Sequence, residues 1–314
     1  MTFAGAAPRD AVGIYGKIPA QGDFVRINAS DPAAQALDLW VQESLEALAR
    51  AGAELPPEPV YFFHQGAAPH GPALVGAMLR SRDRVGRVYP VVAFARVDPA
   101  LVAASVALVP TAWSLFLQDA ARLAYDLERV DAALLAARAR SLRAPSPAEA
   151  QAAVSVGAQV LQRTAAGEVL HRLFVDASAG RHYYAVKTCL DACDTTRSRP
   201  PRAPIVLDCP IASDVDQFTW IELCRRRLAG APVLPTFVWV EGAAPRLLLS
   251  LGPATGAVMR FLARPDDPST QRWPLLTARP DAIEIARNGL APHHRQALES
   301  GGAPLEVFLN ALAR

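Results

Sequence analysis

The hydrophobic positions of this chain form short apolar runs separated by longer amphipathic stretches. In the first third of the chain the runs cover residues 12–16, 60–63, 73–79 and 88–97. Their length and their β-branched or aromatic content predict strands. Pro90 interrupts the last run, which favours an edge position or a bulge there, because proline cannot donate to a sheet ladder. Ser30-Asp31-Pro32 predicts the start of a helix, which Gly52 ends.

The rest of the chain continues this alternation. Thr111 is expected to cap a long helix that reaches about Arg140, and the capping-box spacing from Ser146 to Glu149 predicts another helix to about Arg163. Further strands are predicted at 205–207, 236–240 and 247–251. Helices are predicted at about 213–229, in a short stretch that ends at about residue 262, and once or twice in 281–314. Residues 181–190 fit a strand or a helix, and residues 264–280 are expected to be irregular. Strands separated by helices indicate an α/β fold with a mixed sheet and helices packed on it.

Composition narrows the functional classes. The 314 residues are 51% apolar and carry a net charge of +2, which suits a large core and argues against a nucleic-acid binder. No apolar stretch reaches the roughly 18–20 residues that cross a bilayer, so we expect no membrane insertion. The first residues lack a basic segment followed by an apolar one, so we expect no signal peptide and a cytoplasmic location.

Four cysteines lie within 36 residues, at Cys189, Cys193, Cys209 and Cys224. The C-x3-C spacing and the positions of the nearest histidines do not follow a zinc pattern. Small buried thiols in a reducing compartment are therefore expected, with no metal and no cofactor.

The segment from Gly16 to Arg26, called here the lysine loop, combines Gly16, Pro19 and Gly22 with Lys17, Asp23 and Arg26. Glycine and proline leave little room for a regular element, so this is a shaped loop. Lys17 is one of only two lysines in the chain. The Gly-Lys pair does not fit a P-loop, because Ile18 follows where serine or threonine is needed. Lys17 and Asp23 could act as an acid and a base if they meet.

A second charged segment, residues 80–90, is called here the arginine turn. Four arginines surround Asp83, including Arg84 and Arg87. Such a cluster can hold a phosphate, a carboxylate or an acidic partner through bidentate contacts. It can also be a solvated turn in which Asp83 ties down its neighbours.

Together the two segments resemble the TagF/ImpM family of type VI secretion accessory proteins. The family pattern of the lysine loop matches Gly16, Lys17, Pro19, Gly22, Asp23, Phe24 and Arg26. A helix with W-x-Q is matched at Trp40-Val41-Gln42, and the family turn is matched by Ser81, Asp83, Val85, Gly86, Arg87, Tyr89 and Pro90. The resemblance covers roughly residues 13–97. The chain departs from the family at Ile27-Asn28, at Tyr61-Phe62-Phe63, and in an extra residue before Tyr89.

The resemblance implies an α/β sandwich with a mixed or mostly antiparallel central sheet and helices on both faces. We expect one domain over residues 1–264, with a helical middle at about 111–165, and a C-terminal extension at 265–314 packed on it. The family implies a regulator rather than an enzyme. Its members restrain assembly of the type VI machine, partly by engaging a forkhead-associated scaffold protein.

The two charged segments are expected to lie side by side at one end of the sheet. Lys17 and Asp23 would then lie near Arg84 and Arg87, in a corner that either locks the fold or binds a protein partner. Two other classes stay open. One is an enzyme with a Lys17/Asp23 pocket, and the other is a longin- or roadblock-like adaptor for a small GTPase.

Overall fold

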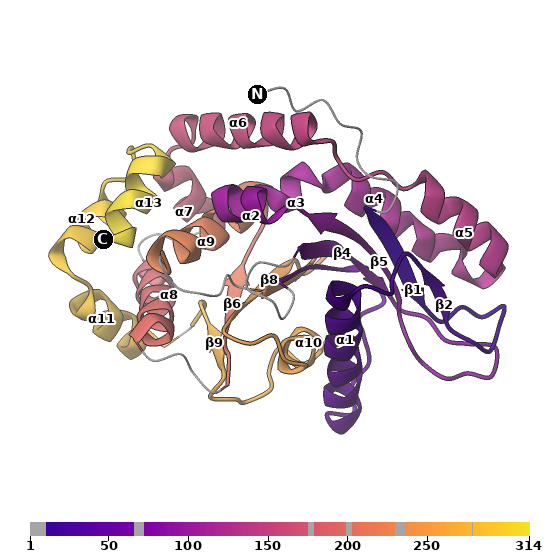
Figure 1. Ribbon diagram of the computed structural model, residues 1–314. Helices are drawn as coiled ribbons and strands as arrows, with labels where there is room; N and C mark the ends of the chain where they lie inside the picture. Colours follow the sequence, from indigo (N-terminus) through magenta and orange to yellow (C-terminus); the bar gives the residue numbers. More distant parts are fainter. Residues whose placement is uncertain (1–10, 66–71, 175–178, 199–202, 230–235, 278) are drawn as a thin grey trace. The chain divides into compact units, whose positions relative to one another are not determined.

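The computed structural model of the chain describes residues 11–65, 72–174, 179–198, 203–229, 236–277 and 279–314 (Figure 1). The chain divides into two compact units. The first consists of Met1–Val154, Phe237–Ala244 and Ala254–Asp267, and the second of Ser155–Thr236, Pro245–Pro253 and Pro268–Arg314. Within the described ranges, no helix combines the length and the apolar character needed to cross a membrane. The mixed α/β fold class is confirmed.

The first unit is built on an antiparallel sheet. Its strands are β1 (Val12–Gly16), β2 (Val25–Ile27), β3 (Val60–Gln65), β4 (Ala73–Leu79), β5 (Val91–Val97) and β7 (Thr236–Val240). Their order is β2-β1-β5-β4-β3-β7. Every residue of β1 and β4 is buried, which explains why these runs are apolar at successive positions rather than alternating. Stacked pairs of rings, Phe63 on Phe237 and Tyr61 on Trp239, join β3 to β7.

The expected edge or bulge at Pro90 is wrong. Strand β5 begins only at Val91 and lies between β1 and β4, paired with both. Pro90 precedes the strand, so its missing N–H removes no ladder hydrogen bond. The apolar run from Val88 to Val97 is therefore divided. Its first residues end the arginine turn, and the rest form a central strand.

Helix α1 (Pro32–Arg50) begins and ends as the sequence predicts. The Asp31 carboxylate accepts the N–H groups of Ala33 and Ala34, Pro32 occupies the first turn, and Gly52 follows the helix with φ +60°. The same carboxylate pairs with Arg96 of β5. The helix N-terminus is therefore capped and fixed to the sheet by one side chain.

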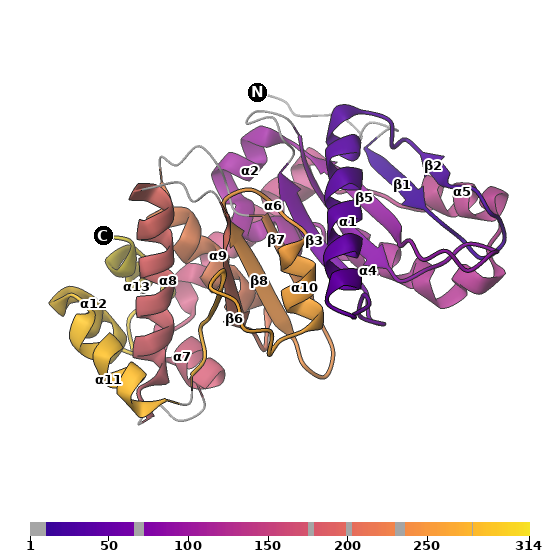
Figure 2. The ribbon, with the colours of Figure 1, turned by 90° about the horizontal axis from the view of Figure 1, so that it is seen from below.

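Helices cover both faces of this sheet. Figures 1 and 2 show α1 beside α10 (Ala257–Ala263) on one face, with α4 (Ser114–Arg122) and α5 (Ala132–Ser141) on the other. Trp40 links the first pair, because its indole N–H donates to the carbonyl of Thr255, 3.1 Å away, just before α10.

The expected single helix from Thr111 to Arg140 is wrong. The region contains α2 (Pro99–Ser105), η1 (Val106–Leu108), α3 (Val109–Ala112), α4, η2 (Leu123–Arg129) and α5. Thr111 lies inside α3 rather than capping a helix. Val130 is extended, and Asp131 caps α5 by accepting the N–H of Leu134. The apolar spacing continues across these breaks, which is why periodicity alone joins them.

The capping box at Ser146 is confirmed. Its hydroxyl accepts the N–H of Glu149, and the Glu149 carboxylate accepts the N–H of Ser146. Helix α6 (Pro147–Arg163) then ends at the predicted residue. It runs from the first unit into the second.

The second unit contains three strands, β8 (Arg246–Leu251), β6 (Ile205–Pro210) and β9 (Arg272–Pro274), in that order. Strands β6 and β8 are antiparallel, whereas β6 and β9 are parallel. The strand β9 lies in the stretch that was expected to be irregular. The strand is only three residues long, Arg272–Pro274, which is too short to show the alternation of apolar and polar positions that predicts a strand.

The helices of the second unit are α7 (Ala166–Phe174), α8 (Arg181–Ser198), α9 (Asp214–Arg227), α11 (Pro280–Gly289), α12 (Pro292–Glu299) and α13 (Leu305–Ala313). Residues 181–190 are thus helical, and the tail forms three helices rather than one or two. Helices α11 and α12 contact α8, and α13 contacts α9 (Figure 1). Two residues separate the end of α11 from Pro292, which begins a new helix and so divides the tail.

A titratable side chain, that of His64 in β3, lies in the core of the first unit. The imidazole is buried, lies 5.1 Å from the Trp40 ring, and has no partner for Nδ1 among the described residues. Burial lowers the pKa of His64 to about 4. The neutral ring is therefore favoured in the folded state.

The stability of the protein should fall as the pH drops from about 6.5 to about 4, because the unfolded chain takes up a proton on His64 before the folded chain does. His64→Phe keeps a ring against Trp40 and removes this titration. Urea unfolding followed by tryptophan fluorescence at pH 7.5 and pH 5 should show a smaller pH-dependent loss in the variant. Equal losses in the two proteins would assign the pH dependence to other groups.

Candidate functional site: a charged corner formed by two loops

The lysine loop leaves β1 at Gly16 and returns in β2 at Val25, its partner in the antiparallel pair. Gly16 has φ +139°, and a Cβ placed there would lie 2.1 Å from the carbonyl oxygen of Pro90. Only glycine permits this backbone to approach the end of the arginine turn so closely. The two segments are therefore in contact at their backbones before any side chain is considered.

The arginine turn is closed on itself by Asp83. One carboxylate oxygen, Oδ1, accepts the N–H groups of Val85 and Arg87 at 3.0 and 2.9 Å. The Asp83 N–H donates to the Arg87 carbonyl, and the Gly86 N–H donates to the Asp83 carbonyl. Gly86 has φ +88°, a conformation that favours glycine at the tip of the turn. An aspartate and a glycine thus set the shape of the turn.

The second oxygen of Asp83 joins the turn to the lysine loop. The ammonium of Lys17 lies 2.9 Å from Oδ2, and Nε of Arg87 lies 2.6 Å from the same atom. The Asp83 side chain is fully buried and that of Lys17 is 10% exposed. Arg87 also donates from Nη2 to the carbonyl of Gly22. One carboxylate therefore binds both segments.

Two backbone contacts complete this join. The Arg84 N–H donates to the carbonyl of Gln21 at 3.1 Å, and the Ser81 hydroxyl donates to the carbonyl of Lys17 at 2.7 Å. Buried polar groups of the loop are thus matched with partners from the turn. The pairing defines the charged corner, which consists of the lysine loop and the arginine turn.

The electrostatic state of Asp83 follows from these contacts. Burial would raise the pKa of its carboxyl group, but hydrogen bonds from Lys17 and from the backbone and side chain of Arg87 outweigh this effect. The pKa of Asp83 therefore lies well below its ordinary value, and the carboxylate is ionised at neutral pH.

A second acid, Asp38 of α1, holds the neighbouring side of the corner. Its carboxylate pairs with Arg26 at 2.6 Å and accepts a hydrogen bond from the Tyr89 hydroxyl. Burial and this hydrogen bond to Asp38 raise the pKa of Tyr89 well above its ordinary value. Arg26 thus belongs to a different ion pair from Lys17. Sequence reasoning missed Asp38, although an acid among the apolar positions Leu37, Trp40 and Val41 of a helix was a visible signal.

Aromatic rings fill the space between the two ion pairs. The Phe24 ring packs edge-on against Tyr89, with 4.8 Å between centroids, and the Lys17 ammonium lies 5.3 Å from the Phe24 centroid. The Arg26 guanidinium lies 5.7 Å from the rings of Tyr15 and Phe24. Cations over these rings add to the ion pairs that hold the corner.

Asp23 and Arg84 are not part of these networks. Both are exposed, and no ion pair of either side chain is found within the described ranges. Lys17 is bound to Asp83 rather than to Asp23, so the acid–base pair considered from the sequence is not formed. Pro19 is half-buried and Pro90 is buried, and each restricts the backbone of its segment. Trp40 lies apart from the corner and anchors α10 instead.

Residues 13–141 match the family model of the TagF N-terminal domain, which is described as type VI secretion system-associated. We call this segment the TagF segment, because it matches the family model over its whole length. The match confirms the resemblance read from the sequence and links this segment to type VI secretion. The TagF segment begins in β1, contains the whole charged corner and Trp40, and ends with α5.

None of the curated proteins matches the chain. Among solved structures, a similar chain is the crystal structure of PA0076 from Pseudomonas aeruginosa PAO1, with 15% sequence identity and a TM-score of 0.38. The alignment covers 82% of this chain and 96% of that one. At this TM-score the likeness carries no structural argument.

The Lys17–Asp83 pair should determine the stability of the TagF segment. Asp83→Asn removes the charge that balances buried Lys17, so we expect Tm to fall by roughly 5–10 °C. Lys17→Met leaves Asp83 with Arg87 and two N–H donors and should cost less. Adding Lys17→Met to Asp83→Asn should cost less than the sum of the two. Asp23→Asn, an exposed carboxylate on the same loop, is the control and should leave Tm unchanged.

The difference in stability between the wild type and Asp83→Asn should shrink as the pH falls below about 4. A carboxylate with a lowered pKa stabilises the fold above its unfolded-state pKa, and this contribution is lost as it is protonated. Thermal unfolding at several pH values tests the sign. A difference that is constant with pH, or an effect of Asp23→Asn as large as that of Asp83→Asn, would contradict the assigned role.

Gly16 and Gly86 offer a matched pair of substitutions. Both have positive φ, but only at Gly16 would a new Cβ meet backbone atoms. Gly86→Ala should cost about 1–2 kcal/mol for its conformation alone. Gly16→Ala should cost about 3 kcal/mol or more, because the lysine loop must also move away from Pro90. Urea unfolding that ranks the two variants equally would refute the close backbone contact.

Proposed function

We propose that this protein is a cytoplasmic, post-translational regulator of type VI secretion that represses assembly of the machine through protein–protein contacts. Its proposed partner is the forkhead-associated scaffold of the system, as the family resemblance implies. No catalytic role is proposed for the charged corner. The TagF match supports the pathway, and the geometry of the corner supports a role in binding.

The observation that carries the proposal is the exposed apolar side chains on the two joined segments. Phe24 is 41% exposed, Val85 68% and Val88 59%. They are accompanied by the exposed charges Asp23 and Arg84. We call these five residues the corner surface. Apolar and aromatic groups among a few charges are typical of protein interfaces.

The ion pairs beneath the corner surface favour binding for an energetic reason. Loops that become ordered only on association lose conformational entropy, which weakens binding. Here Asp83 already fixes both segments through Lys17 and Arg87. The exposed side chains are therefore held in place before a partner arrives, and less entropy is lost in the complex.

The structure also separates two arginines that look alike in sequence. The Arg87 guanidinium is used within the corner, on Asp83 and on the Gly22 carbonyl. Within the described ranges, the contact found for Arg84 is that of its N–H with the carbonyl of Gln21. Arg84 is thus the arginine of this pair that a partner with an acidic surface would contact.

A pull-down with the purified scaffold tests the proposal. Arg84→Ala and Val85→Asp should each lower recovery to about a tenth of the wild type, the effect of losing about 1.4 kcal/mol of binding free energy. Arg50→Ala removes another exposed arginine, from α1, and is the control. All three variants should retain the wild-type Tm.

Three outcomes would contradict the proposal in different parts. Failure of the wild type to bind the scaffold would remove the named partner. Wild-type recovery with both Arg84→Ala and Val85→Asp would remove the corner surface as the contact. Type VI secretion that does not rise when the gene is deleted from a secreting strain would remove repression.

A further inference from the structure

The cysteines of this chain gather in the core of the second unit. Cys189, Cys193 and Cys224 have Sγ atoms that all lie within 4.8 Å of one another. The Sγ atoms of Cys189 and Cys224 are 3.7 Å apart. All three thiols are buried and none forms a disulfide. Three of the four cysteines in a chain of 314 residues thus meet at one point.

Two helices bring the thiols together. Cys189 and Cys193 are one turn apart on α8, so they share a face of that helix. Cys224 comes from α9, which packs against α8. The two cysteines of the C-x3-C pair therefore lie on one helix, and the third cysteine is 31 residues further along the chain.

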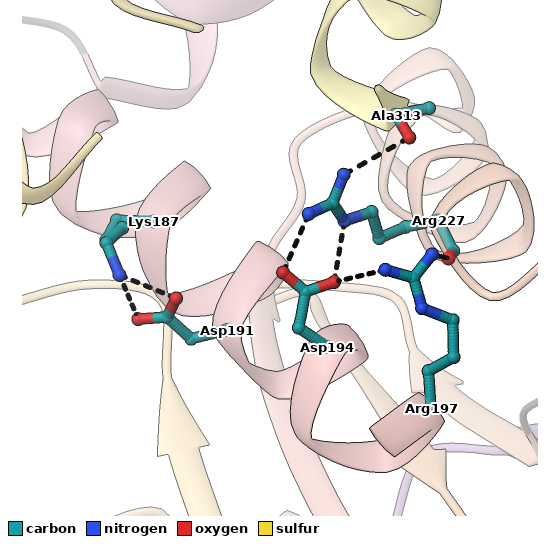
Figure 3. Close-up of polar contacts among 6 residues, drawn as sticks. All are labelled: Lys187, Asp191, Asp194, Arg197, Arg227 and Ala313. Atoms are coloured by element: carbon teal, nitrogen blue, oxygen red, sulfur yellow. Dashed lines mark hydrogen bonds and ion pairs between the residues drawn. The ribbon is translucent and has the colours of Figure 1, made fainter. Parts of the chain in front are cut away.

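Ion pairs beside the thiols fix the position of α8 against α9 (Figure 3). Arg227 forms two hydrogen bonds to Asp194, at 2.8 and 2.7 Å, and a third to the carbonyl of Ala313. Arg197 contacts both Asp194 and the carbonyl of Arg227. Asp194 follows Cys193 directly, and Arg227 lies one turn beyond Cys224. These contacts join α8, which carries Cys189 and Cys193, to α9, which carries Cys224.

The spacing of the sulfur atoms is that of a thiolate metal site. Zn–S bonds of about 2.3 Å place the ligands of a tetrahedral or trigonal ion roughly 3.8–4.0 Å apart. The 3.7 Å between Cys189 and Cys224 already meets this requirement. The upper limit of 4.8 Å for the remaining distances needs only small side-chain rotations. Simple packing of small residues does not require three sulfur atoms to converge.

We propose that Cys189, Cys193 and Cys224 form a three-thiolate site for a soft, thiophilic d¹⁰ ion, Cu⁺ or Zn²⁺. Thiolates select these ions over hard cations. Binding releases thiol protons.

The bound ion would link α8 to α9, so the site stabilises the core of the second unit. The proposal is independent of the corner surface, which lies in the TagF segment. Because the thiols are buried, the ion enters while the helices fold or separate, and loading is best tested during refolding.

The test is refolding of the full chain from urea under anaerobic, reducing conditions with either Cu⁺ or Zn²⁺, followed by gel filtration and elemental analysis. We expect the wild type to retain about one ion per chain and to show a raised Tm. Cys189→Ser, Cys193→Ser and Cys224→Ser should each lose the ion. Cys209→Ser changes an equally buried thiol outside the trio, and should keep it. Comparison of the two ions identifies the one that the site prefers.

Each result decides the proposal. A wild-type protein that refolds and retains neither ion overturns it without reference to any variant. Equal retention by the three trio variants, confirmed as folded by circular dichroism, would place the ion elsewhere. Loss of the ion from Cys209→Ser would replace the three-thiolate site with a four-thiolate one and overturn the assignment made here.

Discussion

The Asp83 carboxylate is the constraint on which the TagF segment is built. A charge with no exposure to water is tolerated only when other charges and hydrogen bonds replace its hydration. Lys17, Arg87 and two backbone N–H groups replace the hydration of Asp83. Lys17 comes from the lysine loop, and the other donors come from the arginine turn. Satisfying one buried acid therefore determines the shape of the arginine turn, the path of the lysine loop and the join between them.

The same solution recurs in both units. Asp38 is held by Arg26 and Tyr89 in the first unit. In the second, fully buried Asp216 pairs with Arg172, and Asp208 pairs with both Arg246 and Arg272 across its strands. Arginine suits this role because its planar group offers several donors at fixed angles. Many arginines of the chain are thus internal partners for acids, and the nearly equal numbers of basic and acidic residues, 32 and 30, make such pairing possible.

Contacts, rather than exposure, divide the residues of the charged corner. Lys17, Asp83 and Arg87 form ion pairs inside the corner, although the Arg87 side chain is 61% exposed. Phe24, Arg84 and Val85 are also exposed, and no ion pair of Arg84 is found within the described ranges. The family motif contains both kinds of residue without distinguishing them. A motif residue can therefore be required for the fold, for a partner, or for both, and only its contacts decide between these roles.

The sequence by itself determined many of the local elements and the resemblance of one segment to a known domain. Asp31 with Pro32, Ser146 with Glu149, and the apolar runs of β1 and β4 encode caps and strands through contacts within a few residues. The motifs identified the TagF segment for the same reason, because they are short and ordered along the chain. Tertiary structure decided which charges meet. Lys17 pairs with Asp83, 66 residues away, rather than with nearby Asp23. Cys224 lies close to two cysteines of another helix. Pairings of this kind depend on which elements pack together, and that choice is made by the whole core rather than by any local pattern.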